Sequence, residues 1–219
     1  MLNELLELPS PFSSIDSDIL KNIATAFDKI ASLKESVICD DAKVKELEQY
    51  IFNEFIKHFS LSDREVALIE DTMLFGLGLF RDGHNSIGFR RTQLSENIMY
   101  AETLYNDINS FLLSSDTKVS ATIYDVQLND PLNLVILHFG KEVKEIEIKN
   151  ITELRKQLQE IDKYTVQKKT HSIYVQKHLK YYDKDTVYLI KPNQKRFWTR
   201  TQAMEDASSL IADIINMAK

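Results

Sequence analysis

The sequence predicts an α+β protein in which an N-terminal helical bundle precedes a smaller mixed domain of about five strands and two helices. Apolar residues recur at helical spacing through the first half of the chain, and beyond Ser114-Ser115 they alternate as in strands. The 219 residues include only 5 Gly and 4 Pro, a composition that favours helices over a glycine-punctuated all-β fold. We therefore expect an arm over 1–16, a helical domain over 17–114 and an α+β domain over 115–219.

The N-terminal half is expected to form the arm and four helices. Two prolines among the first eleven residues remove backbone donors and predict an extended path for the arm. Ser14 or Asp16 can cap the first helix, and Ser62 with Glu65 forms a capping box for the third. The segment FGLGLF in the third helix lacks the strand and turn of a dinucleotide loop, so we interpret its glycines as packing sites. The periodic apolar residues place the four helices at residues 17–37, 41–59, 63–80 and 95–113.

The C-terminal half is expected to contain the strands and two further helices. Gly140-Lys141 is expected to form a hairpin turn between the second and third strands. A helix at 152–164 follows, and Thr199 or Thr201 is expected to cap a terminal helix. Period-2 alternation and short apolar runs place the strands at residues 119–124, 134–139, 143–149, 172–179 and 186–190.

The composition limits where in the cell the protein is expected and which metal or cofactor sites it can contain. No apolar run approaches the roughly 20 residues that cross a bilayer, and the first residues carry acids where a secretory signal needs cations. We expect a cytoplasmic protein with no membrane partner. Cys39 is the single cysteine, which excludes an internal disulfide and a cysteine-based metal cluster, and the five histidines lack zinc-site spacing. We therefore predict no metal and no cofactor.

Positive charge is concentrated near the C-terminus. Between residues 165 and 200, nine Lys or Arg residues accompany two acids, a net charge of +7 within a chain whose total is −6. Aromatic rings among these cations, including Trp198, can stack on bases or on a partner protein, or can instead be core anchors beside solvated lysines. A second contact through Arg90 and Arg91, in the loop at 81–92, is weighed against a plain solvated connection. The predicted main contact residues are Lys177, Lys180, Lys191, Lys195, Arg196, Trp198 and Arg200.

One constellation suggests an alternative, a Mg²⁺-dependent nuclease. Metal-dependent nucleases use an Asp followed by Glu-x-Lys on a strand, and Asp130 with Glu147 and Lys149 fits that order. The two carboxylates would hold the metal, and the lysine would position the attacking water. The same residues also fit an ordinary half-exposed strand and a turn at Asp130. The sequence contains no P-loop and no GxSxG nucleophile motif.

The C-terminal segment resembles a module near the C-terminus of large bacterial N6-adenine DNA methyltransferases of restriction-modification type, and small proteins encoded with them. The shared motifs are Tyr182-Asp183-x-Asp185, the run from Tyr188 to Pro192, the run from Arg196 to Arg200, and the run from Ala203 to Ala207. The upstream LSDREVALIEDT is also similar to the helix that precedes this module. The resemblance covers residues 60–219.

This chain lacks two motifs that those methyltransferases use. They carry a DPPY-type or NPPY-type tetrapeptide and a glycine-rich loop for S-adenosylmethionine, and neither occurs here. The resemblance therefore implies a non-catalytic accessory subunit of a DNA-modification or antiphage defence system. Its expected partners are a DNA methyltransferase, helicase or nuclease protein, with or without DNA. A protein–protein adaptor that makes no DNA contact is the third possibility.

Overall fold

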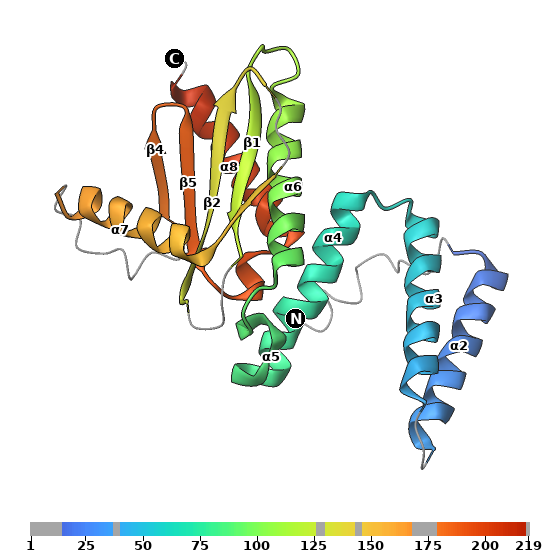
Figure 1. Ribbon diagram of the computed structural model, residues 1–219. Helices are drawn as coiled ribbons and strands as arrows, with labels where there is room; N and C mark the ends of the chain where they lie inside the picture. The colour runs from blue at the N-terminus through green and yellow to red at the C-terminus, as the bar shows by residue number, and fades with distance from the viewer. Residues whose placement is uncertain (1–14, 37–39, 126–129, 143–145, 168–178, 218–219) are drawn as a thin grey trace, which may run out of the picture. The chain divides into compact units, whose positions relative to one another are not determined.

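The computed structural model describes residues 15–36, 40–125, 130–142, 146–167 and 179–217, and of residues 162–167 and 217 only the backbone (Figure 1). The α+β class is confirmed, with helices in the N-terminal part followed by a five-stranded mixed sheet with two further helices. Contacts divide the chain into two compact units, Met1–Val66 and Ala67–Lys219. None of the helices in the described part of the chain combines the length and the hydropathy that a membrane crossing requires.

The first unit contains the helical hairpin of α2 (Ser17–Glu35) and α3 (Asp41–Phe59). Asp16 is the N-cap of α2, because its carboxylate accepts the backbone N–H of Asp18 at 2.7 Å. An ion pair of 3.2 Å between Lys34 and Glu48 joins the two helices. Their shared core is small, and its buried residues are Ile23, Ala26, Ile30, Val44 and Ile51.

The third predicted helix consists of three pieces. These are α4 (Asp63–Asp71), a π-helical turn (Thr72–Leu77) and α5 (Gly78–Asp82). The predicted capping box is present, since the Ser62 N–H donates to the Glu65 carboxylate at 2.8 Å and the Glu65 N–H to the Ser62 hydroxyl at 3.4 Å.

Five strands form one sheet in the order β3-β1-β2-β5-β4. The β1–β3 pair is parallel, and the other three pairs are antiparallel. The strands are β1 (Lys118–Tyr124), β2 (Leu132–Gly140), β3 (Glu147–Lys149), β4 (Leu179–Asp183) and β5 (Thr186–Pro192).

One strand prediction needs correction, and another falls mostly outside the described residues. The expected hairpin turn at Gly140-Lys141 does not join neighbouring strands, because β1 and β5 occupy both edges of β2 and leave β3 to pair with β1. The described residues contain a strand at Leu179–Asp183, and the rest of the strand expected at 172–179 falls outside them. The β4–β5 turn is tight and places Lys184 at φ 50°, a left-handed backbone that fixes the strand ends.

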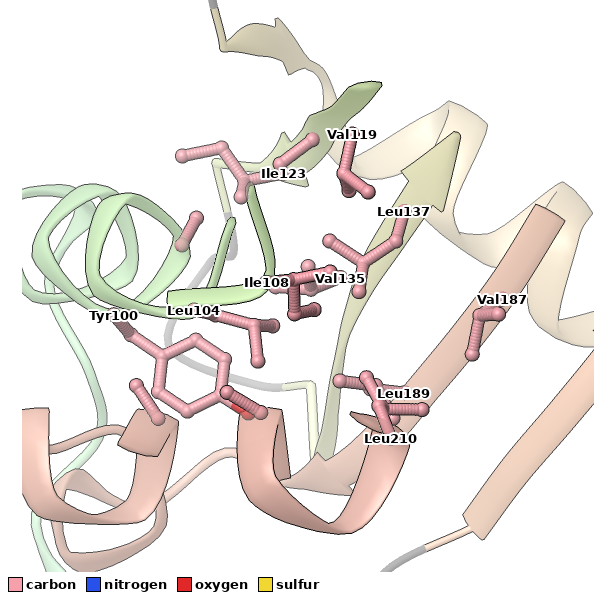
Figure 2. Packing of buried hydrophobic residues seen from close by; sticks show 14 of the residues in the cluster. Tyr100, Leu104, Ile108, Val119, Ile123, Val135, Leu137, Val187, Leu189 and Leu210 are labelled. Atoms are coloured by element: carbon pink, nitrogen blue, oxygen red, sulfur yellow. The ribbon is translucent and has the colours of Figure 1, made fainter. Parts of the chain in front are cut away.

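Helices cover both faces of the sheet. α6 (Leu94–Phe111) and α8 (Arg200–Met217) pack on one face, and α7 (Ile151–Gln167) packs on the other. Figure 2 shows Tyr100, Leu104 and Ile108 of α6 in the main core with residues from β1, β2, β5 and α8. The expected boundary at 114/115 would separate α6 from the sheet that it covers. Thr199 caps α8, since its hydroxyl accepts the Gln202 N–H at 3.2 Å.

Candidate functional site

Lys191 was predicted to contact a partner at the surface, and the structure contradicts this. It lies on β5 and is 2 % exposed. Its ammonium group donates to the Asp206 carboxylate of α8 and, at 3.2 Å, to the carbonyl of Phe197. The same ammonium group lies 4.6 Å from the centre of the Tyr100 ring. A cation enclosed by a carboxylate, a carbonyl and a ring is part of the core.

The buried charges of this cluster compensate one another. The Tyr100 hydroxyl also donates to Asp206, so the carboxylate receives hydrogen bonds from α6 and from β5. Burial raises the pKa of Tyr100 well above its ordinary range, and the negative charge of Asp206 adds to this effect. Burial lowers the pKa of Lys191, while attraction to Asp206 opposes that change. The three side chains tie α6, β5 and α8 together.

Trp198 is a core anchor, which was the alternative to its predicted contact role. It is buried, and its indole N–H donates to the Pro192 carbonyl at 2.9 Å. Its ring meets the Tyr100 ring edge-on, with 4.9 Å between their centres. This ring is closed to bases and to partner side chains.

The other predicted basic contacts that the structure describes are engaged within the fold. Lys180 pairs with Asp213 at 3.1 Å, Lys195 pairs with Glu96, and Arg200 pairs with Glu70. Each pair links two elements of the sheet-containing unit. Lys177 lies outside the described residues.

The arginines also make contacts within the chain. The Arg196 guanidinium lies 4.5 Å from the centre of the Phe89 ring and 4.7 Å from that of Phe197. Arg91 donates to the backbone carbonyl of Asp130, which gives this predicted second contact a structural role. Arg90 keeps an exposed side chain. In the described part of the basic segment at 165–200, the cations therefore mostly support the fold and only in part form a charged surface.

Asn193 is a structural residue that the sequence interpretation missed. Its side-chain oxygen accepts hydrogen bonds from the N–H of Thr92, at 3.2 Å, and from the Thr92 hydroxyl, at 2.6 Å. Its amide donates to the Asp130 carbonyl at 3.1 Å, and its backbone N–H donates to Pro131 at 2.8 Å. The Lys191-Pro192-Asn193 sequence is a recognisable turn signal. The remote residues that Asn193 contacts cannot be identified from the sequence.

The proposed nuclease residues do not form one constellation. Asp130 is held by Arg155 of α7 at 3.1 Å, whereas Glu147 pairs with Lys149 at 3.3 Å and accepts from the Thr122 hydroxyl at 3.1 Å. β1 separates β2, which begins just after Asp130, from β3, which carries Glu147. Within the described residues, no group of three or more His, Cys, Asp or Glu side chains is arranged to hold a metal ion.

The electrostatics of Glu147 follow from these partners. Desolvation acts to raise its pKa, but hydrogen bonds from Lys149 and Thr122 and the charge of Lys149 hold the pKa below its ordinary value. The carboxylate is therefore charged and already hydrogen-bonded at neutral pH. This arrangement fits an exposed ion pair on the edge strand β3.

The helix of α4, the π-helical turn and α5 presents large apolar side chains to solvent. We call them the apolar helix face, and Phe80 is the most exposed at 89 %. Its members recur mainly at intervals of three and four residues along the helix. The apolar helix face consists of Leu68, Ile69, Met73, Leu74, Leu77 and Phe80.

Two acidic residues of the same helix contact the start of α8. Glu70 pairs with Arg200, and the Asp71 carboxylate accepts the backbone N–H of Thr201 at 2.9 Å. Both contacts lie at the first turn of α8, where a carboxylate is favoured by the helix dipole. These acids anchor one side of the helix, and large apolar residues point outward elsewhere on it, which departs from the usual amphipathic arrangement.

In comparisons with known proteins, no family model, curated protein or solved structure matches this chain. The apolar helix face is the feature of the described residues that most resembles an interaction site, since monomeric soluble proteins rarely expose large contiguous apolar patches.

Proposed function

We propose that this chain is a non-catalytic accessory subunit of a bacterial DNA-modification or antiphage defence system, and that it holds a partner enzyme through a protein–protein contact. The system is inferred from the resemblance of residues 60–219 to the methyltransferase module. The mode of binding is inferred from the exposed side chains of the sheet-containing unit.

The orientation of the apolar helix face carries the proposal. Glu70 and Asp71 fix one side of the helix to the start of α8, so the outward side is held in place while it has no partner. A preformed apolar surface loses little conformational entropy on binding. Its Met and Phe side chains suit a protein interface, where aromatic residues and Met are enriched. We infer that a groove or an apolar helix of the partner covers it.

The basic segment favours a protein partner over DNA. DNA affinity depends on cations that neutralise phosphates and release counterions. Lys180, Lys195 and Arg200 already pair with carboxylates, and breaking these pairs would oppose DNA binding. Lys191 is enclosed in the core. The adaptor interpretation therefore requires less rearrangement of the fold than a DNA-contact interpretation.

The test is co-purification of the tagged chain from its native host, with nuclease treatment before elution. We expect a methyltransferase, helicase or nuclease protein to co-elute, and to stay bound in high salt because apolar contacts are not screened. Recovery of the chain with none of these partners would contradict the proposal. A partner that is lost on nuclease treatment would show that DNA mediates the contact, and a partner lost only in high salt would show a contact through charges instead of the apolar helix face.

A further inference from the structure

Each helix of the α2–α3 hairpin carries a second apolar stripe, whose side chains are half-buried or exposed. On α2, Ile23, Ala26 and Ile30 are buried, while Phe27 is 55 % exposed. At about 100° per residue, the residues on the exposed side of α2 are spaced by four, three and four positions. They are the half-buried Leu20 and the exposed Ala24, Phe27 and Ala31. The matching stripe of α3 consists of the half-buried Phe52 and Ile56 and the exposed Phe59.

The two stripes lie on the same side of the hairpin. On both helices this stripe is displaced from the buried one by roughly 100° in the direction in which the helix turns. Because consecutive helices joined by a short connection run antiparallel, as α2 and α3 do in Figure 1, equal displacements turn both stripes to one side. Together they form one mainly apolar surface, which we call the hairpin face, and the exposed Lys34–Glu48 ion pair lies on the same side of the hairpin.

The two stripes of the hairpin face complement each other in size. Ala24 and Ala31 make the α2 stripe shallow, whereas Phe52, Ile56 and Phe59 make the α3 stripe bulky. Bulky side chains of one helix pack well against small ones of another. A two-helix hairpin with few core residues also gains most from a further layer, and four helices are a common solution.

We propose that a second copy of this chain covers the hairpin face, so that two hairpins form a four-helix bundle. The two-fold axis runs along the bundle, which places α2 of each copy against α3 of the other. Residues at one level of the hairpin then meet residues at the same level of the second copy. Phe27 packs near Phe52 of the other copy, and Ala24 receives Ile56.

Charge at the rim supports a second copy as the occupant. Near the connection between the helices, Glu35 of α2 and Lys45 of α3 continue the two stripes at the end of the hairpin face, and both side chains are exposed. In the two-fold arrangement Glu35 of each copy lies beside Lys45 of the other, which forms two equivalent pairs of opposite charge. This complementarity repeats by symmetry, as an isologous interface requires.

The experiment measures the oligomeric state of the 219-residue chain by sedimentation equilibrium and native mass spectrometry. Wild type is expected to be a dimer. Phe27→Glu is expected to be a monomer, because it places a charge in the centre of the hairpin face. The matched control is Tyr50→Glu, which should remain a dimer, since Tyr50 lies on the other flank of α3 and is 39 % exposed, as Phe59 is.

A pair of charge reversals distinguishes a weakened dimer from a folding defect, because the second reversal should restore the dimer. Glu35→Lys should weaken the dimer by roughly tenfold, and adding Lys45→Glu should restore it, since two rim pairs change together. A monomeric wild type would overturn the proposal, as would a dimer that survives Phe27→Glu or a double reversal that fails to restore affinity. The inference does not depend on the proposed function, because Met73→Glu on the apolar helix face should leave the dimer intact.

Discussion

Lys191 on β5 and Asp206 on α8 form an ion pair inside the fold, with the Tyr100 hydroxyl donating to the same carboxylate. Removing one member of such a pair leaves an uncompensated charge in the core, whereas removing both leaves a cavity but no charge. Variants of this pair therefore test whether Lys191 has a structural role in the fold or a contact role at the surface.

Replacement of Lys191 by Met should reduce the free energy of unfolding by about 3–5 kcal/mol, because Asp206 then stays buried without its cation. Chemical denaturation measures this loss. Exposed Lys156 provides the control, and Lys156→Met should change stability by less than about 0.5 kcal/mol.

The double variant Lys191→Met with Asp206→Leu should be less destabilised than the sum of the two single variants, because neither charge remains in the core. A double-mutant cycle from denaturation curves measures this coupling. Additive losses would mean that the two side chains do not act as a pair.

Replacement of Asn193 by Ala should cost about 1–3 kcal/mol, since the groups around Thr92 and Asp130 lose partners in a buried setting. Thermal unfolding measures the effect against Asn106→Ala, a change at an exposed position of α6. Equal stability of the two variants would contradict the role of Asn193 as a junction.

Asp213 predicts a pH dependence of stability. A hydrogen bond from Tyr182, followed by a hydrogen bond and charge attraction from Lys180, holds the pKa of Asp213 below its ordinary 3.8. Because the folded pKa is depressed, the stabilisation is complete well above pH 3.8 and is lost as pH falls through the folded pKa. The difference in Tm between wild type and Asp213→Asn should thus be largest at neutral pH and vanish in acid. A difference that is independent of pH would contradict this account.

The nuclease alternative makes a separate prediction. Asp130 is occupied by Arg155, and Glu147 by Lys149 and Thr122, so we expect no Mg²⁺-dependent cleavage of DNA by wild type or by Glu147→Gln. The assay is incubation with duplex and single-stranded DNA with and without Mg²⁺. Cleavage by wild type that disappears in Glu147→Gln would reinstate the nuclease.

Local features of the fold could be predicted from the sequence, whereas remote partnerships could not. The caps at Asp16 and Ser62 involve residues within three positions, so their signals are visible in the chain. The β1–β3 pairing depends on which strand edges remain open, and this is settled only when the whole sheet forms.

In the candidate functional site, too, contacts between residues distant in the sequence could not be predicted. Nothing near Lys191 in the sequence reveals that its partner is on α8, so a cluster of lysines resembled a surface. The segment FGLGLF was interpreted through its glycines as a packing site, and Gly78 is buried, but Leu77 and Phe80 are exposed. The outward orientation of these two side chains follows from contacts that Glu70 and Asp71 make with a helix that begins more than a hundred residues later.

The central claim is that the apolar helix face holds the partner enzyme. Its most direct test is co-purification from the native host with Met73→Glu plus Leu77→Glu, compared with Leu113→Glu, an exposed apolar residue beyond α6 that is 76 % exposed. We predict that the first variant folds as wild type does by circular dichroism but loses the partner protein, while Leu113→Glu keeps it. Full retention of the partner by the folded double variant would contradict the account.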